Sequence, residues 1–219
     1  LWLHVDGAHG AAALLSPKYR PLLRGLDRAD SFVWDAHKNM LMPALITAVV
    51  FRDGGHSYEA FSQKASYLFE KSAVEEWYNY AHRTMECTKT MMGMRLFISL
   101  AAYGTDFFGG YVTAAWDLAR EFDRRLRAAG DFETVVEPES NIVCFRYVHK
   151  GETDSDSLQR RIRRALLEQG HFYVVQTELS GRTWLRCTLI NPRTTIADLE
   201  ALMDEIRLLA ASPLPEQLD

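Results

Sequence analysis

The chain has 219 residues, of which 47% are hydrophobic and 25% charged, so it can bury a sizeable core in one large domain or two small ones. A formal net charge of −4 gives no electrostatic reason to expect nucleic acid or an anionic membrane as a partner. No hydrophobic run approaches the ~18 residues of a membrane span. The three cysteines lie far apart without metal-ligand spacing, which favours a reducing, cytoplasmic compartment and no metal site.

The first 53 residues alternate between hydrophobic runs and a short helical segment. We predict strands over residues 1–7, 30–36 and 44–53, and a short helix over residues 10–15. Such runs are typical of buried strands in a mostly parallel sheet of an α/β protein. Ligands of these sheets bind at the carboxyl ends of the strands. Asp6 and Lys38 both follow strand ends, so we expect them to face the same crevice.

The middle of the chain contains an aromatic segment and then two helical patterns. Residues 66–86 contain three tyrosines and a tryptophan without a clear period, which indicates a functional loop or lid. Helices are predicted from about Thr88 to Gly104 and from about Tyr111 to Gly130, because glycine often ends a helix. We assign residues 1–104, including the lid, to a large domain and residues 105–219 to a small one.

The small domain is predicted to be an α+β module. Its elements are strands over 132–138 and 141–148, a helix over 154–169 capped by Gly170, and a hairpin of residues 171–179 and 183–190 around Ser180-Gly181. A last helix begins at Thr195, with Asp198 in the capping position. On the second hairpin strand, alternation places Arg186 on the face opposite the core residues.

A lysine at the end of a buried strand is costly unless the protein uses it. Burial lowers the pKa of a lysine amine, and a free amine can attack a carbonyl group. A carboxylate on a neighbouring strand end suits pyridoxal phosphate (PLP), which needs an acid at its pyridine nitrogen. Lys38 and Asp6 therefore suggest a PLP site. The alternative is that Lys38 extends to solvent and Asp6 caps the helix that follows.

Three stretches resemble one enzyme family: "HVDGAHG", "ADSFVWDAHK" about thirty residues later, and "LRCTLINPRTT" near the end. Together they resemble the PLP-dependent group II amino-acid decarboxylases, which include glutamate, aromatic amino acid, cysteine sulfinate and diaminobutyrate decarboxylases. The resemblance covers essentially the whole chain. It implies the type I, aspartate aminotransferase-like fold, a homodimer, and conversion of an L-amino acid to its amine with release of carbon dioxide.

The resemblance also implies roles for residues of the first two stretches. Lys38 resembles the lysine that holds PLP as a Schiff base, and Asp6 resembles the partner of the pyridine nitrogen. Ala8 resembles the residue that packs on the ring, and His37 the histidine that helps to hold the phosphate. A histidine whose ring is satisfied by structural hydrogen bonds is the alternative for His37. His9 is a candidate contact for the substrate side chain or for a neighbouring subunit.

Further roles fall on the aromatic loop and on the small domain. In this family a mobile loop presents a tyrosine that protonates the substrate carbon after decarboxylation, and Tyr80, or else Tyr78, matches its position. These rings could instead only pack. Arg186 resembles the residue that grips the substrate carboxylate, a task that suits the geometry of guanidinium. The alternative is an ordinary exposed arginine.

Departures from the family pattern leave the substrate open. Asn39 stands where many members have a bulky residue, and Gly7 where alanine is common. The family also uses N-terminal residues for the phosphate and for stacking on the ring, so we expect the chain to correspond to the C-terminal half and to be inactive alone. Other PLP chemistry, as in an aminotransferase or a decarboxylating oxidase, is an alternative. So is a non-catalytic half that partners a complementary N-terminal chain.

Overall fold

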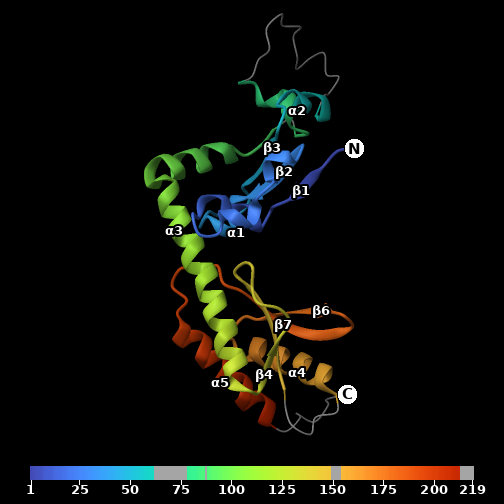
Figure 1. Ribbon diagram of the computed structural model, residues 1–219, viewed down its shortest axis with the longest axis vertical. Helices are drawn as coiled ribbons and strands as arrows, with labels where there is room; N and C mark the ends of the chain where they lie inside the picture. Colours follow the sequence, from blue (N-terminus) through green and yellow to red (C-terminus); the bar gives the residue numbers. More distant parts are fainter. Residues whose placement is uncertain (62–77, 87, 149–153, 213–219) are drawn as a thin grey trace, which may run out of the picture. The chain divides into compact units, whose positions relative to one another are not determined.

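The computed structural model describes residues 1–61, 78–86, 88–148 and 154–212 (Figure 1). The chain divides into two compact units, Leu1–Val112 and Thr113–Asp219. A domain boundary after residue 104 stays a prediction. None of the helices in the described ranges is long and hydrophobic enough to cross a membrane.

The first unit contains a three-stranded sheet with the strand order β1-β2-β3 (Figure 1). Its strands are β1 (His4–Asp6), β2 (Ser31–Asp35) and β3 (Thr47–Phe51). The pairing of β1 with β2 is parallel, as the alternation of strands and helices predicted, whereas β3 adds an antiparallel strand. The parallel pair needs a crossover connection, which carries the 3-10 helices η1 (Gly10–Leu15), η2 (Arg20–Leu23) and η3 (Leu26–Arg28).

The first unit has a small hydrophobic core that includes residues directly after β2. The one-turn helix α1 (Ala36–Asn39) follows β2 directly, and its Ala36 packs with the buried side chains of Met40, Met42, Ile46 and Phe108. Helix α2 (Gly55–Ala60) and the 3-10 helix η4 (Tyr80–Arg83) complete the described elements of this unit, apart from the first part of α3.

Helix α3 (Met92–Ala129) joins the two predicted helices into one element with an internal break. The break is at Gly104, whose φ of 73° and ψ of 169° are not helical. Glycine has no Cβ and adopts a positive φ without strain. The helix end predicted at Gly104 is confirmed, and the ribbon changes direction there (Figure 1).

The second unit is an antiparallel sheet with the second part of α3 and two further helices. The strand order is β4-β5-β7-β6, formed by β4 (Phe132–Thr134), β5 (Ile142–Tyr147), β6 (Val175–Leu179) and β7 (Arg182–Thr188). The predicted hairpin is confirmed, since β6 and β7 pair across Ser180 and Gly181. Both turn residues have a positive φ, which matches the right-handed twist of the flanking strands.

The predicted end of α4 and the predicted start of α5 are confirmed. Helix α4 (Ser155–Gln169) ends at Gly170 in the left-handed conformation. Helix α5 (Ile196–Ala211) begins with a capping box, in which Thr195 and Asp198 satisfy each other's backbone N–H groups. The core between sheet and helices includes Phe122, Phe145, Leu166, Leu185 and Ile206, which are all fully buried. Each such side chain contributes about 1.5–3 kcal/mol of hydrophobic stabilisation.

Candidate functional site

The carboxyl ends of β1 and β2 lie next to each other and are joined by hydrogen bonds. In the parallel register Asp6 is opposite Val33, so both strands end at the same edge of the sheet. Beyond the strands, the backbone N–H of Asp35 donates to the carbonyl oxygen of Ala8 at 3.1 Å. The side chain of Asn39 donates to the carbonyl oxygen of His9 at 2.7 Å. Residues 6–9 and 35–39 are therefore neighbours, joined by two hydrogen bonds.

Gly7 allows the turn after β1 to pack directly on β2. A Cβ at this residue would lie 2.9 Å from the carbonyl oxygen of Val33 and 2.8 Å from the Cβ of Ala11. Both distances are shorter than real Cβ contacts, so a residue larger than glycine would push the turn away. The close approach explains glycine here, where the family pattern commonly has alanine.

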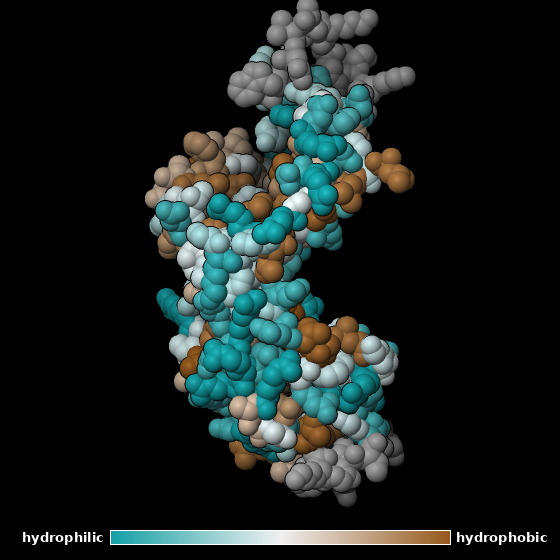
Figure 2. Space-filling view, viewed as in Figure 1, coloured by the Kyte–Doolittle hydropathy of each residue, from teal (hydrophilic) through white to brown (hydrophobic). Residues whose placement is uncertain are grey.

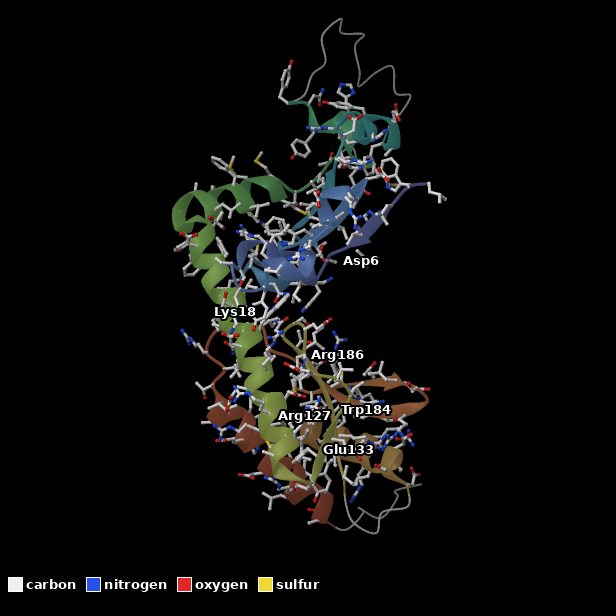
Figure 3. All side chains as sticks on the ribbon, viewed as in Figure 1. Asp6, Lys18, Arg127, Glu133, Trp184 and Arg186 are labelled. Carbon is white, nitrogen blue, oxygen red and sulfur yellow. The ribbon has the colours of Figure 1, made fainter. Side chains whose placement is uncertain are left out.

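Asp6 ends β1 as an exposed carboxylate (Figure 3). One of its oxygens accepts a hydrogen bond from the backbone N–H of Ala8 at 3.1 Å, which forms a local turn. Within the described ranges no ion pair involves Asp6. Asp6 also does not cap η1, because the N-cap of that helix is His9 and no side chain caps it. The carboxylate is thus available to a ligand, and the helix-cap alternative is wrong.

Lys38 lies in α1 and forms an ion pair with Asp35. The distance between Nζ of Lys38 and Oδ2 of Asp35 is 2.7 Å, and the lysine side chain is 40% exposed. The expectation that Lys38 is buried is therefore wrong, because its side chain remains in contact with water. The amine is held by a carboxylate of its own strand end instead.

Asp35 is the residue of this site that the sequence analysis missed. Its side chain is almost buried and accepts hydrogen bonds from Lys38 and from the hydroxyl of Thr47, at 2.6 Å. Burial alone raises the pKa of Asp35, but the hydrogen bonds and positive charge around it outweigh burial, and the pKa is lowered overall. The signal in the sequence was the acid three residues before the lysine, a spacing that brings two side chains together on a helical turn.

His37 contacts the backbone of Ile46. Nδ1 of His37 lies 3.1 Å from the backbone N–H of Ile46, from which it can accept, and 3.0 Å from the carbonyl oxygen of Ile46, to which it donates when it carries the proton. The other ring nitrogen, Nε2, lies 3.8 Å from Oδ2 of Asp35. One ring nitrogen thus has a structural role, and Nε2 is the nitrogen that could reach a phosphate group.

The two candidate tyrosines lie at the start of η4. Most of the predicted lid, residues 66–77, lies outside the described ranges, but Tyr78 and Tyr80 are described and both are strongly exposed. The guanidinium of Arg83 lies 5.5 Å from the ring centre of Tyr80. A Cβ built at Gly93 would be 4.0 Å from the Tyr80 hydroxyl, so this hydroxyl lies beside the start of α3.

Arg186 belongs to the second unit, whereas Lys38 and Asp6 belong to the first (Figure 3). It lies on β7, directly opposite Cys144 on β5 and Val175 on β6. Leu185 and Cys187, its neighbours on the strand, are buried as predicted. Among the described residues the side chain of Arg186 has no ion-pair or hydrogen-bond partner, and the residue is partly exposed, so the guanidinium could bind an anion.

The donor set at the two strand ends fits PLP. The cofactor requires a primary amine for its aldehyde and a carboxylate for its pyridine nitrogen. Lys38 and Asp6 supply these groups from the ends of adjacent parallel strands, and the small residues Gly7 and Ala8 follow Asp6. The carboxyl end of parallel strands is also where α/β sheets bind ligands.

Comparisons with known proteins point to the same chemistry. Residues 1–148 match the model of the pyridoxal-dependent decarboxylase conserved domain. The aromatic-L-amino-acid decarboxylase of Bacillus atrophaeus is 28% identical over 214 residues, which cover 96% of this chain and 45% of that protein. The cysteine sulfinic acid decarboxylase of Homo sapiens is 28% identical over 225 residues, which cover 95% and 45%.

Solved structures resemble the chain over the same extent. Mouse CSAD in apo form gives a TM-score of 0.85 at 24% identity, covering 96% of this chain and 46% of that structure. The glutamate decarboxylase domain of a diaminobutyrate-pyruvate transaminase and L-2,4-diaminobutyrate decarboxylase from Vibrio parahaemolyticus gives 0.77 at 26% identity, covering 96% and 39%. The fold is that of type I PLP-dependent enzymes, as predicted.

The matches cover most of this chain but only part of each relative. The chain spans less than half of the length of these relatives. The family model, by contrast, covers more than half of the chain, including both strand ends with Asp6 and Lys38. The chain therefore belongs to the family of pyridoxal-dependent decarboxylases.

Proposed function

We propose that the protein is a PLP-dependent carboxy-lyase that converts an L-amino acid to the corresponding amine and releases carbon dioxide. The observation that carries this proposal is the placement of Lys38 and Asp6 at the joined ends of β1 and β2. Membership of the family supports it. The two relatives named above are an aromatic-L-amino-acid decarboxylase and a cysteine sulfinic acid decarboxylase, so the proposal does not extend to one substrate.

The residues at the two strand ends would hold the cofactor. Lys38 would bind it covalently through Nζ, and Asp6 would face the pyridine nitrogen and favour its protonated form. Ala8 would pack against the ring, and Nε2 of His37 would contact the phosphate. When bound, PLP accepts the electrons that the substrate carbon keeps as its carboxylate leaves.

Other side chains would act on the substrate. Tyr80 would deliver a proton to the substrate carbon, with Tyr78 as the second candidate, because a positioned phenol is a suitable general acid once water is excluded. Arg186 would bind a substrate carboxylate through two parallel hydrogen bonds. The absence of a competing acid next to Arg186 among the described residues supports this role. His9 would contact the substrate side chain.

A homodimer, or a complex with a complementary chain, fits the surface of the first unit. Hydrophobic side chains gather just before and along the first part of α3 (Figure 2). These exposed residues are Met91, Met94, Phe97, Ile98, Tyr103 and Phe107. A cluster of this kind on a surface is typical of a protein–protein interface. A reducing compartment such as the cytoplasm fits the free thiols of Cys144 and Cys187.

The decisive experiment asks whether Lys38 anchors the cofactor. PLP is added to the intact protein, and the visible absorption band of the bound cofactor is recorded for the wild type and for Lys38→Ala, Asp6→Asn and Lys18→Ala. Borohydride reduction followed by peptide mass spectrometry then locates the cofactor. The band and the label are expected to be lost in Lys38→Ala and unchanged in Lys18→Ala, whose lysine is exposed and remote in sequence.

Further outcomes separate decarboxylation from other PLP chemistry. Asp6→Asn should keep the label on Lys38 but reduce carbon dioxide release by orders of magnitude, because the ring nitrogen loses its acid. A product screen across amino acids should give an amine and carbon dioxide. Formation of a keto acid or an aldehyde would indicate an aminotransferase or an oxidase instead. A band that survives in Lys38→Ala would end the proposal.

A further inference from the structure

The carboxylate of Asp35, at the end of β2, contacts two other side chains. Its Oδ2 lies 2.7 Å from Nζ of Lys38, and its Oδ1 accepts a hydrogen bond of 2.6 Å from the hydroxyl of Thr47. Its backbone N–H is bonded to Ala8. The side chain of Asp35 is 10% exposed, whereas the side chain of Lys38 is 40% exposed. A fixed carboxylate therefore holds a side chain that has room to move.

We propose that Asp35 is the positioning residue of Lys38, and that its carboxylate holds the amine at the end of β2 before the cofactor binds. This inference rests on the proposed function only in taking Lys38 as the anchor. Asp35 itself need not touch the cofactor. Its action is to restrict where Nζ lies and to compete for the amine with any other reaction partner.

The geometry favours a specific interaction over a chance surface contact. Exposed ion pairs contribute little because water and salt screen them and two mobile side chains must be ordered. Here one partner is already ordered by Thr47 and by its own backbone, so only the lysine loses freedom. The lowered pKa of Asp35 is consistent with a carboxylate that stays ionised beside Lys38.

The other groups around the pair leave Lys38 as the main cation at Asp35. Nε2 of His37 lies 3.8 Å from Oδ2 of Asp35, beyond hydrogen-bonding distance. Thr47 is the contact from β3 and does not ionise. From the segment after β1, His9 contributes its carbonyl oxygen to Asn39, and Asp6 is bonded to Ala8. Helix η1, which also packs on α1, has no ionisable side chain.

The test measures how readily Lys38 reacts in the cofactor-free intact protein. Competitive acetylation with peptide mass spectrometry gives the labelling rate of Lys38 relative to the exposed Lys18 in the same sample. Asp35→Asn removes the charge but can still accept the bond from Thr47. We expect this variant to raise the ratio roughly tenfold, which corresponds to ~1.4 kcal/mol. Thr47→Val should raise it by a smaller factor, because the carboxylate is less firmly held.

A matched control removes a different ion pair of the same sheet. Asp30 directly precedes β2 and pairs with Arg52, at the opposite end of the strand from Asp35, so Asp30→Asn should leave the Lys38 ratio unchanged. An unchanged ratio in folded Asp35→Asn, or an equal rise in Asp30→Asn, would overturn the proposal. Because the label is a simple acylating agent, the result does not depend on whether PLP binds, and it separates this inference from the proposed function.

A second measurement does not require Asp35→Asn to fold. Since Lys38 lowers the pKa of Asp35, replacing the lysine raises it. A carboxylate with a lowered pKa stabilises the fold above its unfolded value, and this contribution is lost as the pH falls through the folded value. The acid unfolding midpoint should therefore move to higher pH in Lys38→Met and stay unchanged in Lys18→Met. The same midpoint in both variants would contradict the role of Asp35.

Discussion

The side-chain amide of Asn39 donates a hydrogen bond of 2.7 Å to the backbone oxygen of His9, and this bond joins the segments that follow β1 and β2. Asn39 is only 1% exposed, so water cannot replace the amide if it is removed. This hydrogen bond gives a structural reason for asparagine at residue 39, where the family pattern commonly has a bulky residue. It fixes the segment of Asp6 against the segment of Lys38 inside this chain.

Replacement of Asn39 by alanine should therefore destabilise the protein by about 1–3 kcal/mol, the cost of leaving a buried polar group without its partner. The measurement is urea unfolding of the intact protein. Asn191→Ala is the matched control, because the side chain of Asn191 makes a local bond to the N–H of Arg193 on the surface. If Asn39→Ala lowers the free energy of unfolding no more than the control does, the bond does not hold the two segments together.

Two adjacent glycines of α3 should respond in opposite directions to alanine. A Cβ at Gly109 would lie 2.2 Å from the carbonyl oxygen of Leu15, whereas a Cβ at Gly110 would meet nothing within 4 Å. We expect Gly109→Ala to cost more than ~2 kcal/mol, because helix and backbone must separate. Gly110→Ala should stabilise by up to about 1 kcal/mol, since alanine favours a helix. Thermal unfolding of both variants decides this, and similar shifts would contradict the close packing of α3 on η1.

The residues that carry the proposed chemistry could be found from the sequence because strand ends and residue types are local signals. Asp6 and Lys38 each follow a hydrophobic run, and the parallel pairing brings those ends together. The environment of Lys38 could not be found in this way. Its exposure depends on how α1 packs, and its partner Asp35 was predicted only as part of the strand over residues 30–36.

Local signals also explain which parts of the fold were predicted well. Gly104, Gly170 and the Ser180-Gly181 turn mark backbone conformations that few other residues adopt, so their positions agree with the structure. The antiparallel direction of β3 was not predicted, because a run of hydrophobic residues does not encode the direction of its neighbour. Partner choice is a property of the folded sheet.

The ion pair of Asp131 with Arg207 should make stability depend on pH in the acid range. Nε and Nη2 of Arg207 donate to the two oxygens of Asp131 at 2.7 and 2.9 Å. These bonds lower the pKa of Asp131. The unfolded value is about 3.9, so the contribution is complete above that pH and is lost as the pH falls through the lower, folded value.

Arg207→Met should accordingly cost about 1 kcal/mol at pH 7, where the pair is intact, and progressively less at acid pH. Urea unfolding at a series of pH values measures the difference from the wild type. Arg164→Met serves as the control, because its pair with Glu168 is strongly exposed and should contribute under ~0.5 kcal/mol. A cost in Arg207→Met that does not decrease at low pH would show that the loss comes from packing on Phe132 and not from the charge.

The position of Arg186 opposite Cys144 gives a chemical probe of the candidate carboxylate-binding residue. Directly opposed residues of antiparallel strands have Cβ atoms about 5 Å apart. Burial raises the pKa of the Cys144 thiol, and the nearby charge of Arg186 partly counteracts it. Burial raises the pKa of Cys187 much further, to about 12. Iodoacetamide should therefore modify Cys144 before Cys187, since the thiolate is the reactive form.

Removing the charge of Arg186 should slow that reaction. A unit charge at about 6 Å in a water-like dielectric changes the thiolate fraction roughly threefold, so Arg186→Met should lower the rate at Cys144 by about this factor. Arg186→Lys should keep most of the rate, and Arg182→Met should not change it, because Arg182 pairs with Glu133 instead. Peptide mass spectrometry follows each cysteine separately. If Arg186→Met and Arg182→Met slow the reaction of Cys144 equally, the guanidinium of Arg186 does not face the thiol. That result would contradict the proposal that Arg186 binds an anion on this face of β7.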